Sequence, residues 1–326
     1  MRQIAEDMLC QEAGHLLGQW MGEKLADFRL RFAKFGDAFT IDYGLVEEPE
    51  LSKFGLRFVH AGSALANWQN KTELADNHPE FIEFLPFQTV YFFPIPDDYM
   101  LHAEIHQDLF SSALRQVFLA RALRIFVHNA SVPASMQGAL RLTCEDYCVG
   151  NILPSVAQKY PEGLMEFFLN VTEAPSFETQ PNRTILSFRG TVDAYVRLID
   201  ENRSSKAILS SKVRLRFQLE DWRLDQVYGI VYPAEIVPMD TTIEEVGKID
   251  RHFNGEDITE EQIYALVSGL KEEVLVRLVE KSAKVGLPLP KLRGMFVEQF
   301  ELTPVDKHLI LNANASISDI LWWFDV

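Results

Sequence analysis

Three short segments carry residue types that support chemistry in other proteins. "HAEIH" places His102 and His106 four residues apart, the spacing of two metal ligands on one helical face. Its glutamate stands in the wrong place for a zinc peptidase, and no third ligand is evident. "HAGSALA", from His60 to Ala66, lacks the G-x-S-x-G spacing of a nucleophile elbow. We therefore expect no metal, no cofactor and no enzymatic activity.

The cysteines form the next chemical group. The chain has three, an odd number for an oxidising compartment, so one is free or its partner lies outside this chain. Cys144 and Cys148, in "TCEDYC", can form a local disulfide if the backbone turns between them. As zinc ligands they lack a second pair.

Composition excludes some classes of protein. The chain has 326 residues, 47% of them hydrophobic, and a net charge of -16. This length and composition allow a large buried core. A nucleic-acid binder needs a basic face, so nucleic acid is not an expected partner. No run of about 18 apolar residues exists, and the first nine residues are too charged for a signal peptide.

Six asparagines stand in N-x-S/T sequons, more than chance would place in this sequence. They predict passage through the secretory pathway and an extracellular location, while a cytoplasmic location stays open. The predicted glycosylation sites are Asn70, Asn129, Asn170, Asn182, Asn202 and Asn314.

The first third of the chain must position these groups through a mixture of helix and strand. Apolar residues at every third or fourth position predict a helix over residues 2–34, ended by Gly36. Extended segments follow up to residue 66, broken at Pro49, and a polar irregular stretch covers 68–84. Another extended pattern runs over 89–105, and a second amphipathic helix is predicted over 107–124.

The rest of the chain is dominated by long alternating strands. A short helix is predicted within 152–163, ended by Pro161, and strands are predicted over 184–200 and 212–221. In the second strand Lys212, Arg214 and Arg216 lie on the polar side, the usual pattern of a solvated face.

A third helix is predicted after Asp257, where "DITEEQ" supplies an N-cap and early acidic residues, and strands return near the end. This order favours an α+β fold, in which a highly twisted antiparallel sheet wraps around long amphipathic helices. The apolar residues between sheet and helices pack against each other or leave a tunnel for acyl chains.

The segment "KVGLPLP", followed by "LRGMFVEQFELTPVDKHLILNANAS", resembles the end of the second domain in the bactericidal/permeability-increasing family. That family includes LPS-binding protein and the plasma lipid transfer proteins, and belongs to the tubular lipid-binding superfamily. "IDYGLVEEPEL", "LHAEIHQDLFSSALRQVF" and "LTCEDYCVGNILPSVAQKYPEG" resemble further family segments in the same order. "AEDMLCQEAGHLLGQWMGEKL" resembles the last helix of the family's first domain. The resemblance covers essentially the whole chain.

The resemblance implies a domain organisation. Residues 1–36 would be the last helix of a first domain that is mostly absent, 37–88 the central-sheet strands and linker, and 89–326 the C-terminal lipid-binding domain. Cys10 would pair with a cysteine of the missing part. Cys144 and Cys148 have no reliable counterpart in the family, and this acidic chain does not match the basic domain that engages lipopolysaccharide.

The ending "DILWWFDV" also departs from the family, whose members usually end in a plain strand. Adjacent tryptophans face opposite ways on a strand. Trp322, Trp323 and Phe324 would therefore contact a membrane or a partner, or would pack under the end of the barrel.

From this resemblance we expect a non-catalytic protein that holds phospholipid or a similar acyl-chain lipid in an apolar tunnel, for lipid transfer or innate-immune lipid recognition. The alternative is a scaffold or protein-interaction module that keeps the fold without bound lipid. An ordinary core would show the same helical stripes. The residues predicted to line the tunnel are Phe110, Leu114, Val117, Leu266, Leu270, Val274 and Leu278.

Overall fold

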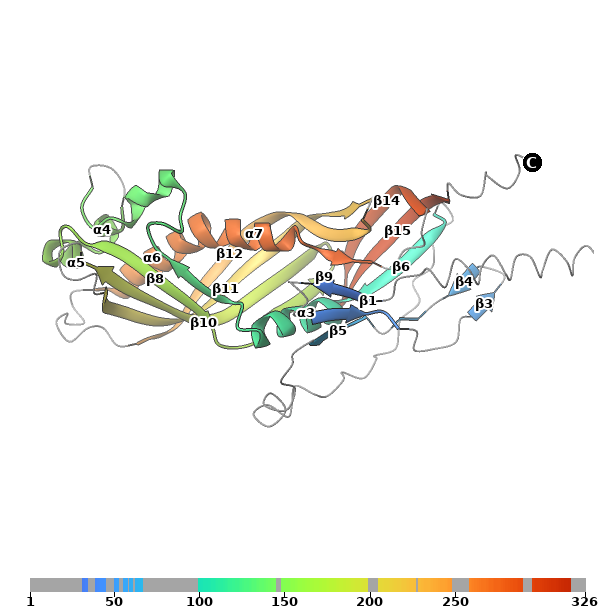
Figure 1. Cartoon of the computed structure of the whole chain (residues 1–326), viewed down its shortest axis with the longest axis horizontal. Coiled ribbons are helices and arrows are strands. Elements are labelled where there is room, and N and C mark those ends of the chain that lie inside the picture. The colour runs from blue at the N-terminus through green and yellow to red at the C-terminus, as the bar shows by residue number, and fades with distance from the viewer. Residues whose placement is uncertain are drawn as a thin grey trace, which may run out of the picture.

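The computed structural model describes most of the last two thirds of the chain and short parts of the first third (Figure 1). The residues it describes are 31–34, 39–44, 50–52, 55–57, 59–60, 62–66, 99–144, 148–198, 205–226, 228–247, 258–289 and 295–317.

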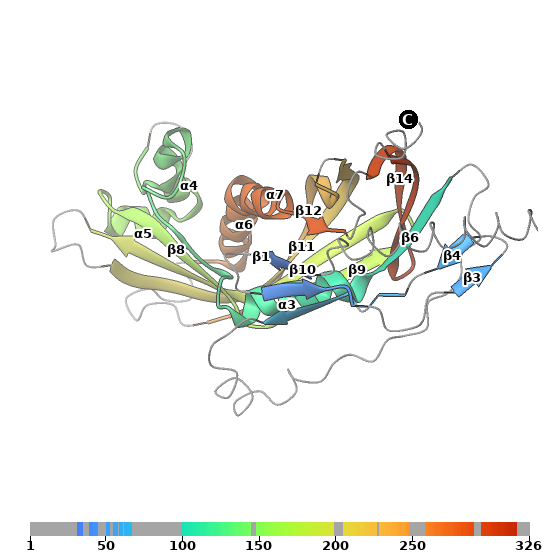
Figure 2. The same ribbon diagram turned by 45° about the vertical axis from the view of Figure 1, so that its right-hand side comes forward.

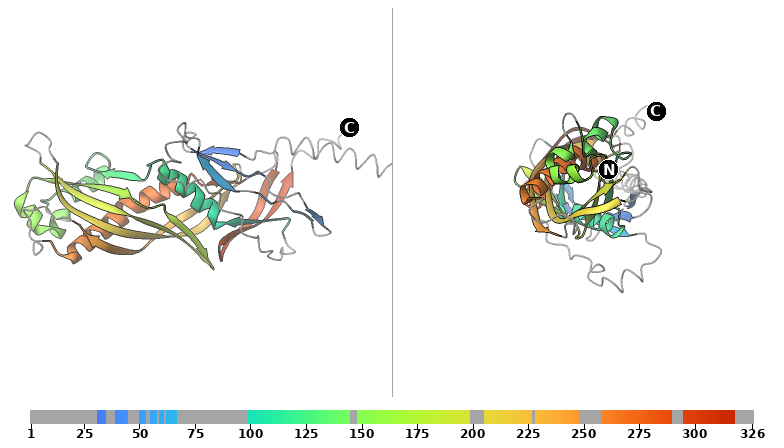
Figure 3. Two further views of the ribbon diagram at one scale, coloured as in Figure 1. Left: turned by 90° about the horizontal axis from the view of Figure 1, so that it is seen from below. Right: turned by 90° about the vertical axis from the view of Figure 1, so that its left-hand side faces the viewer.

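A long antiparallel sheet forms the body of the molecule. Its hydrogen-bonded order is β13-β12-β11-β10-β8-β7, and β9 also pairs with β10. Three strands are unusually long and give the sheet its length and curl (Figures 1 and 3). The bounds are β7 (Arg124–Val127), β8 (Leu164–Val171), β9 (Ser176–Gln180), β10 (Arg183–Arg197), β11 (Ser205–Asp225), β12 (Ile230–Val246) and β13 (Leu287–Pro288).

The smaller sheets lie beside this body: β14, β6, β3 and β4 are toward one end, and the sheet that contains β1 is beside α3 (Gln107–Leu119) nearer the middle (Figure 2). One contains three strands in the order β14-β15-β6, another has the order β1-β2-β5, and β3 pairs with β4. The bounds are β1 (Arg31–Lys34), β2 (Phe39–Asp42), β3 (Glu50–Ser52), β4 (Gly55–Arg57), β5 (Ser63–Ala66), β6 (Leu101–His106), β14 (Met295–Val305) and β15 (His308–Ile317).

The helices lie along the inside of the curled sheet or at its ends (Figure 3). Two segments are long: α3, and the continuous run of α6, η3 and α7. The bounds are α3 (Gln107–Leu119), η2 (Ala134–Leu140), α4 (Val149–Ile152), α5 (Pro154–Lys159), α6 (Glu260–Leu270), η3 (Lys271–Leu275) and α7 (Val276–Ala283). The predicted α+β fold, a twisted antiparallel sheet around amphipathic helices, is confirmed.

Two predicted helix boundaries are wrong. The first helix does not reach residue 34, because Arg31–Lys34 forms β1 and pairs with β2, with Arg31 opposite Asp42. Residues 1–30 lie outside the described residues. The second helix ends at Leu119 instead of residue 124, because Arg121 takes a positive φ of 53° and the next residues join the sheet as β7. Sheet pairing overrides an apolar periodicity near the end of a helical pattern.

The residues that follow α7 are apolar, although a polar turn is usual at the end of a helix. Their backbone conformation and pairing explain why. Gly286 has a φ of 59°, and a side chain there would come within 2.3 Å of Ile230, so glycine is required. The chain then pairs Leu287 with Val231 as β13. The buried Tyr43 hydroxyl donates to the Pro288 carbonyl at 2.5 Å, which connects this exit to the region after β2. Burial raises the pKa of Tyr43 far above its ordinary value.

Candidate functional site: the two faces of the long sheet

The inner face of the long sheet is apolar because alternate residues point toward the helices. On β11 these inward side chains are Val213, Leu215, Phe217 and Leu219, all buried. They belong to one continuous hydrophobic core that also includes inward residues of β8, β10, β12 and α6. We call this surface the inner face. It is the region where the sequence predicts lipid-lining residues.

Helix α3 contributes an aromatic cluster to the inner face. Phe110 stacks on Phe177 of β9 with ring centroids 4.3 Å apart, and its edge contacts Trp222 of β11 at 5.7 Å. Leu114 and Val117 are partly buried and pack against the same core. The structure therefore places all three predicted α3 residues on the apolar inner side.

Helix α6 begins at a complete capping box. The Thr259 hydroxyl accepts from the backbone N–H of Gln262, whose side chain accepts from the backbone N–H of Thr259. From this fixed start Leu266 and Leu270 point into the core and are buried, while their predicted role in lining a lipid tunnel stays a prediction. Ile263 and Val267 complete the buried stripe of α6.

The stripe does not continue as the sequence predicts, because η3 is a π-helical turn. One extra residue in a turn rotates the following side chains by roughly 100° about the helix axis. Leu275 is buried, whereas Val274 is only partly buried and Leu278 is 37% exposed on the outward side of α7. The sequence predicts Leu278 among the lining residues, but the structure places it on the exposed side of α7. Leu275 takes the inward position instead.

The first residue of η3 is a buried lysine. Lys271 is 3% exposed, and its Nζ donates to the backbone carbonyl of Met239 on β12. Burial lowers the pKa of Lys271, while the charges of Glu272 and Asp240 act in the opposite direction. Lys271 follows Val267 by four residues and Ile263 by eight, so helical spacing places it on the buried stripe of α6. The sequence analysis missed its burial because a lysine is grouped by its charge with the exposed residues.

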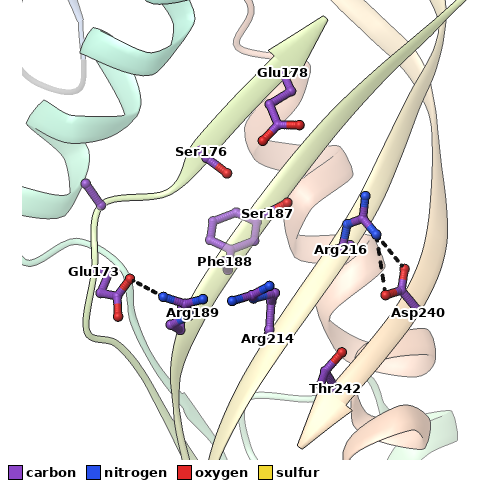
Figure 4. A pocket seen from close by; sticks show the side chains of 11 residues that line it. Glu173, Ser176, Glu178, Ser187, Phe188, Arg189, Arg214, Arg216, Asp240 and Thr242 are labelled. Atoms are coloured by element: carbon purple, nitrogen blue, oxygen red, sulfur yellow. Dashed lines mark hydrogen bonds and ion pairs between the residues drawn. The ribbon is translucent and has the colours of Figure 1, made fainter. Parts of the chain in front are cut away.

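The opposite side of the sheet carries a pocket of about 490 Å³, which we call the outer pocket (Figure 4). Most of it is built from outward side chains of β9, β10, β11 and β12, so it faces away from the inner face. Its lining residues are Glu173, Ala174, Ser176, Glu178, Ser187, Phe188, Arg189, Arg214, Arg216, Asp240 and Thr242.

Ion pairs organise the outer pocket. Arg189 contacts Glu173 through Nη1 at 2.9 Å and contacts Glu244 Oε1 through Nε at 3.0 Å. Arg214 Nη2 lies 3.1 Å from the same Glu244 oxygen, and Arg216 lies 3.3 Å from Asp240. The strand pattern places Arg214 and Arg216 on a solvated face, and their convergence with Arg189 depends on the cross-strand register.

The structure confirms the local disulfide between Cys144 and Cys148, with an S–S distance of 2.05 Å. Cys10, Asn70, Asn202, Trp322, Trp323 and Phe324 lie outside the described residues. Asn182 is exposed in the turn between β9 and β10, whereas Asn314 is half-buried and its amide donates to Gln299. Asn129 and Asn170 are half-buried, and whether any sequon is used stays a prediction.

His102 and His106 lie on strand β6, not on a helix. His102 is 2.7 Å from the Asn312 amide oxygen, and His106 accepts from the Asp108 N–H as the N-cap of α3. Among the described residues no group of three or more His, Cys, Asp or Glu side chains could hold a metal ion. Within the same residues, no helix is long and apolar enough to cross a membrane.

Two comparisons with known proteins point to the same group of proteins. The family model described as "LBP / BPI / CETP family, C-terminal domain" matches residues 33–317. A solved structure described as "Crystal structure of lipopolysaccharide binding protein" is similar at 15% sequence identity with a TM-score of 0.45. That match covers 89% of this chain and 57% of the other, so this chain spans little more than half the length of that protein. No curated protein matches the chain significantly.

Proposed function

Since the chain belongs to the LBP / BPI / CETP family, we propose that it is a non-catalytic protein that holds phospholipid or a similar acyl-chain lipid against its inner face. One observation carries the proposal: the sheet and the inward sides of α3 and α6 form a single apolar surface. Each methylene group of an acyl chain buried there contributes about 0.8 kcal/mol. Affinity therefore needs no catalytic residue.

The aromatic cluster marks the best place on this surface for an acyl chain. Phe110, Phe177 and Trp222 come from three separate elements and meet ring to ring. Phe110 and its α3 neighbours Leu114 and Val117 are only partly buried, so they are the apolar side chains that a lipid can still cover. We propose that these α3 residues contact the lipid, and that the fully buried Leu266 and Leu270 support it from the core.

Native mass spectrometry after gentle purification tests the proposal. Co-purified lipid, together with uptake of a fluorescent phospholipid, is the expected result. The variant Leu114→Trp should reduce uptake because its larger ring fills space beside Phe110. The matched control Leu278→Trp places the same ring on the outward side of α7 and should leave uptake unchanged. Protein that carries no lipid and takes up none would contradict the proposal.

A second candidate function is a scaffold or protein-interaction module without bound lipid. The close packing of Leu266 and Leu270 in the core favours it, because a packed inner face needs no ligand to exclude water. The experiment above separates the two functions. Lipid-free protein that keeps an unchanged unfolding midpoint when phospholipid is added would support the scaffold.

We also propose passage through the secretory pathway. The six sequons and the Cys144–Cys148 disulfide support it, because disulfides persist in oxidising compartments. Asn182 is the site most open to a glycan, since it is exposed in a turn. Expression in a secreting eukaryotic cell should give a glycosidase-sensitive mass shift that decreases in Asn182→Gln. The absence of any shift would remove the main support for this assignment.

A further inference from the structure

The outer pocket differs in chemistry from the inner face. Its residues alternate along the strands with core residues: Glu178 follows Phe177, and Arg214 and Arg216 flank Leu215. One lining residue is an exception, since Phe188 also packs against the core beside Phe217. Otherwise a ligand in the pocket contacts mainly charged and hydroxyl groups. A volume of about 490 Å³ is enough for a small polar molecule or a headgroup.

Two guanidinium groups of the pocket converge on one oxygen atom. Arg189 and Arg214 stand opposite each other in the β10–β11 register, and both lie near Glu244 Oε1, at 3.0 and 3.1 Å. Figure 4 shows the two guanidinium groups side by side. A guanidinium carries five N–H donors, so this pair keeps donors for a second anionic oxygen. Paired arginines are the side chains best suited to phosphate.

The pocket also holds a carboxylate that lacks a partner. Glu173, Asp240 and Glu244 each pair with an arginine. The exposed Glu178 carboxylate forms no ion pair or hydrogen bond with any residue that the structure describes. Because carboxylates attract ammonium groups, this end of the pocket favours a cation.

The balance of charge decides between ligand classes. The three arginines face Glu173, Glu178, Asp240 and Glu244, so the local net charge is -1. A simple anion gains from the arginines but is repelled by this excess. A zwitterion matches both signs, with its anionic group at the arginine pair and its cation at Glu178.

We propose that the outer pocket binds a phosphoammonium zwitterion, that is, a phosphate joined by a short linker to an ammonium group. Arg189 and Arg214 hold the phosphate, Glu178 holds the ammonium, and the hydroxyls of Ser187 and Thr242 supply further hydrogen bonds. This chemistry occurs in soluble phosphocholine and in phospholipid headgroups. The proposal goes beyond lipid uptake at the inner face and does not depend on it.

Titration of the intact protein with soluble phosphocholine, followed by NMR or calorimetry, tests the site. Arg214→Gln should weaken binding about tenfold, because it removes the charge-assisted hydrogen bonds that this guanidinium donates to the phosphate. Lys212→Gln is the matched control: it removes one positive charge from the same side of β11, at a residue that pairs with Glu245 and does not line the pocket. Equal unfolding midpoints of the two variants would show that the fold is intact.

The second arm tests the ammonium end. Glu178→Gln should weaken phosphocholine binding and leave binding of inorganic phosphate unchanged or stronger. Glu235→Gln removes a carboxylate of β12 outside the pocket and should change neither. If inorganic phosphate binds the unmodified protein as tightly as phosphocholine does, the zwitterion assignment is overturned.

Vesicles of phosphatidylcholine distinguish the two sources of the ligand. Flotation with vesicles that is weakened by Arg214→Gln and spared by Lys212→Gln would assign the pocket to a headgroup at a membrane surface. Binding of soluble phosphocholine without flotation would assign it to the free compound. Binding of neither probe, or equal effects of the Arg214 and Lys212 variants, would overturn the proposal. Because soluble phosphocholine has no acyl chain, this result is distinguishable from failure of lipid uptake.

Discussion

The inner and outer faces of the long sheet are built from the same strands and differ in almost every other respect. On β11, Leu215 and Phe217 are buried against the helices, whereas Arg214 and Arg216 point outward into a charged pocket. Burial of apolar surface stabilises the first face, and partly exposed ion pairs organise the second. The difference indicates that the inner face supplies most of the stability, and that substitutions on the outer face should change the free energy of unfolding little.

The strongest test of this comparison exchanges neighbouring residues of β11 for alanine. Phe217→Ala should lower the free energy of unfolding by about 3–5 kcal/mol, because it leaves a cavity where a side chain is 1% exposed. Arg216→Ala should cost under about 1 kcal/mol, because its ion pair with Asp240 is partly exposed. Urea unfolding followed by tryptophan fluorescence measures both. Equal losses would break the distinction between the faces.

Lys271 is a buried charged residue among the apolar side chains of the inner face, so it tests whether burial alone stabilises that face. Met239 lies at an irregularity in the β11–β12 register, where it has no partner on β11, and Lys271 donates to its carbonyl. Lys271→Ala leaves that carbonyl without its donor and should cost about 1–3 kcal/mol. The control Lys281→Ala, exposed on α7, should stay within about 0.5 kcal/mol of the unmodified protein. A loss as small as that of the control would show that the buried lysine contributes nothing to stability.

The capping box at Thr259 tests how firmly the long helix is fixed on the inner face. Thr259→Ala removes the acceptor of the Gln262 N–H and should lower the free energy of unfolding by about 1 kcal/mol. Ser282→Ala, in the exposed last turn of α7, serves as control and should change stability little. Thermal unfolding followed by circular dichroism gives both values. A Thr259 variant as stable as the control would contradict the role of the cap.

The smallest expected effect is a pH dependence at His106, where β6 passes into α3. Burial lowers the pKa of His106; the charges of His308 and Lys307 lower it further, and Asp108 raises it. The unfolded chain therefore binds a proton before the folded one as the pH falls. The contribution of neutral His106 to the free energy of unfolding is therefore complete above the unfolded histidine pKa of about 6.5, and it decreases as the pH falls below that value.

The variant His106→Asn isolates this effect, because asparagine keeps an N-cap acceptor and does not titrate near neutral pH. At pH 7.5 its urea midpoint should match that of the unmodified protein. Between pH 6.5 and 5 its stability should decrease less steeply. An unchanged slope would show that His106 does not account for the acid sensitivity.

Much of the fold follows from local patterns in the sequence. Alternation in "KVRLRFQLED" predicts which side of β11 is buried, and "DITEEQ" predicts where α6 begins. Gly286 predicts the end of α7 because glycine readily takes the positive φ found just after a helix, here 59°. The spacing of Cys144 and Cys148 permits a local disulfide without requiring it, and the structure forms it.

Other features depend on contacts between residues far apart in the chain. The π-helical turn moves Leu278 outward, a change of phase that the periodicity does not contain. Residues 31–34 and 124–127 form strands because neighbouring strands pair with them. The outer pocket exists because cross-strand register brings Arg189 and Arg214 together.

The sequence by itself determined the class of the fold, the apolar and polar sides of its strands and the family. These properties depend on periodicity, composition and short spacings, which a linear chain displays directly. The tertiary structure alone decided which helix residues face the core and which charges meet across strands. Both depend on the rotation and register of whole elements, and those are fixed only when the elements pack against each other.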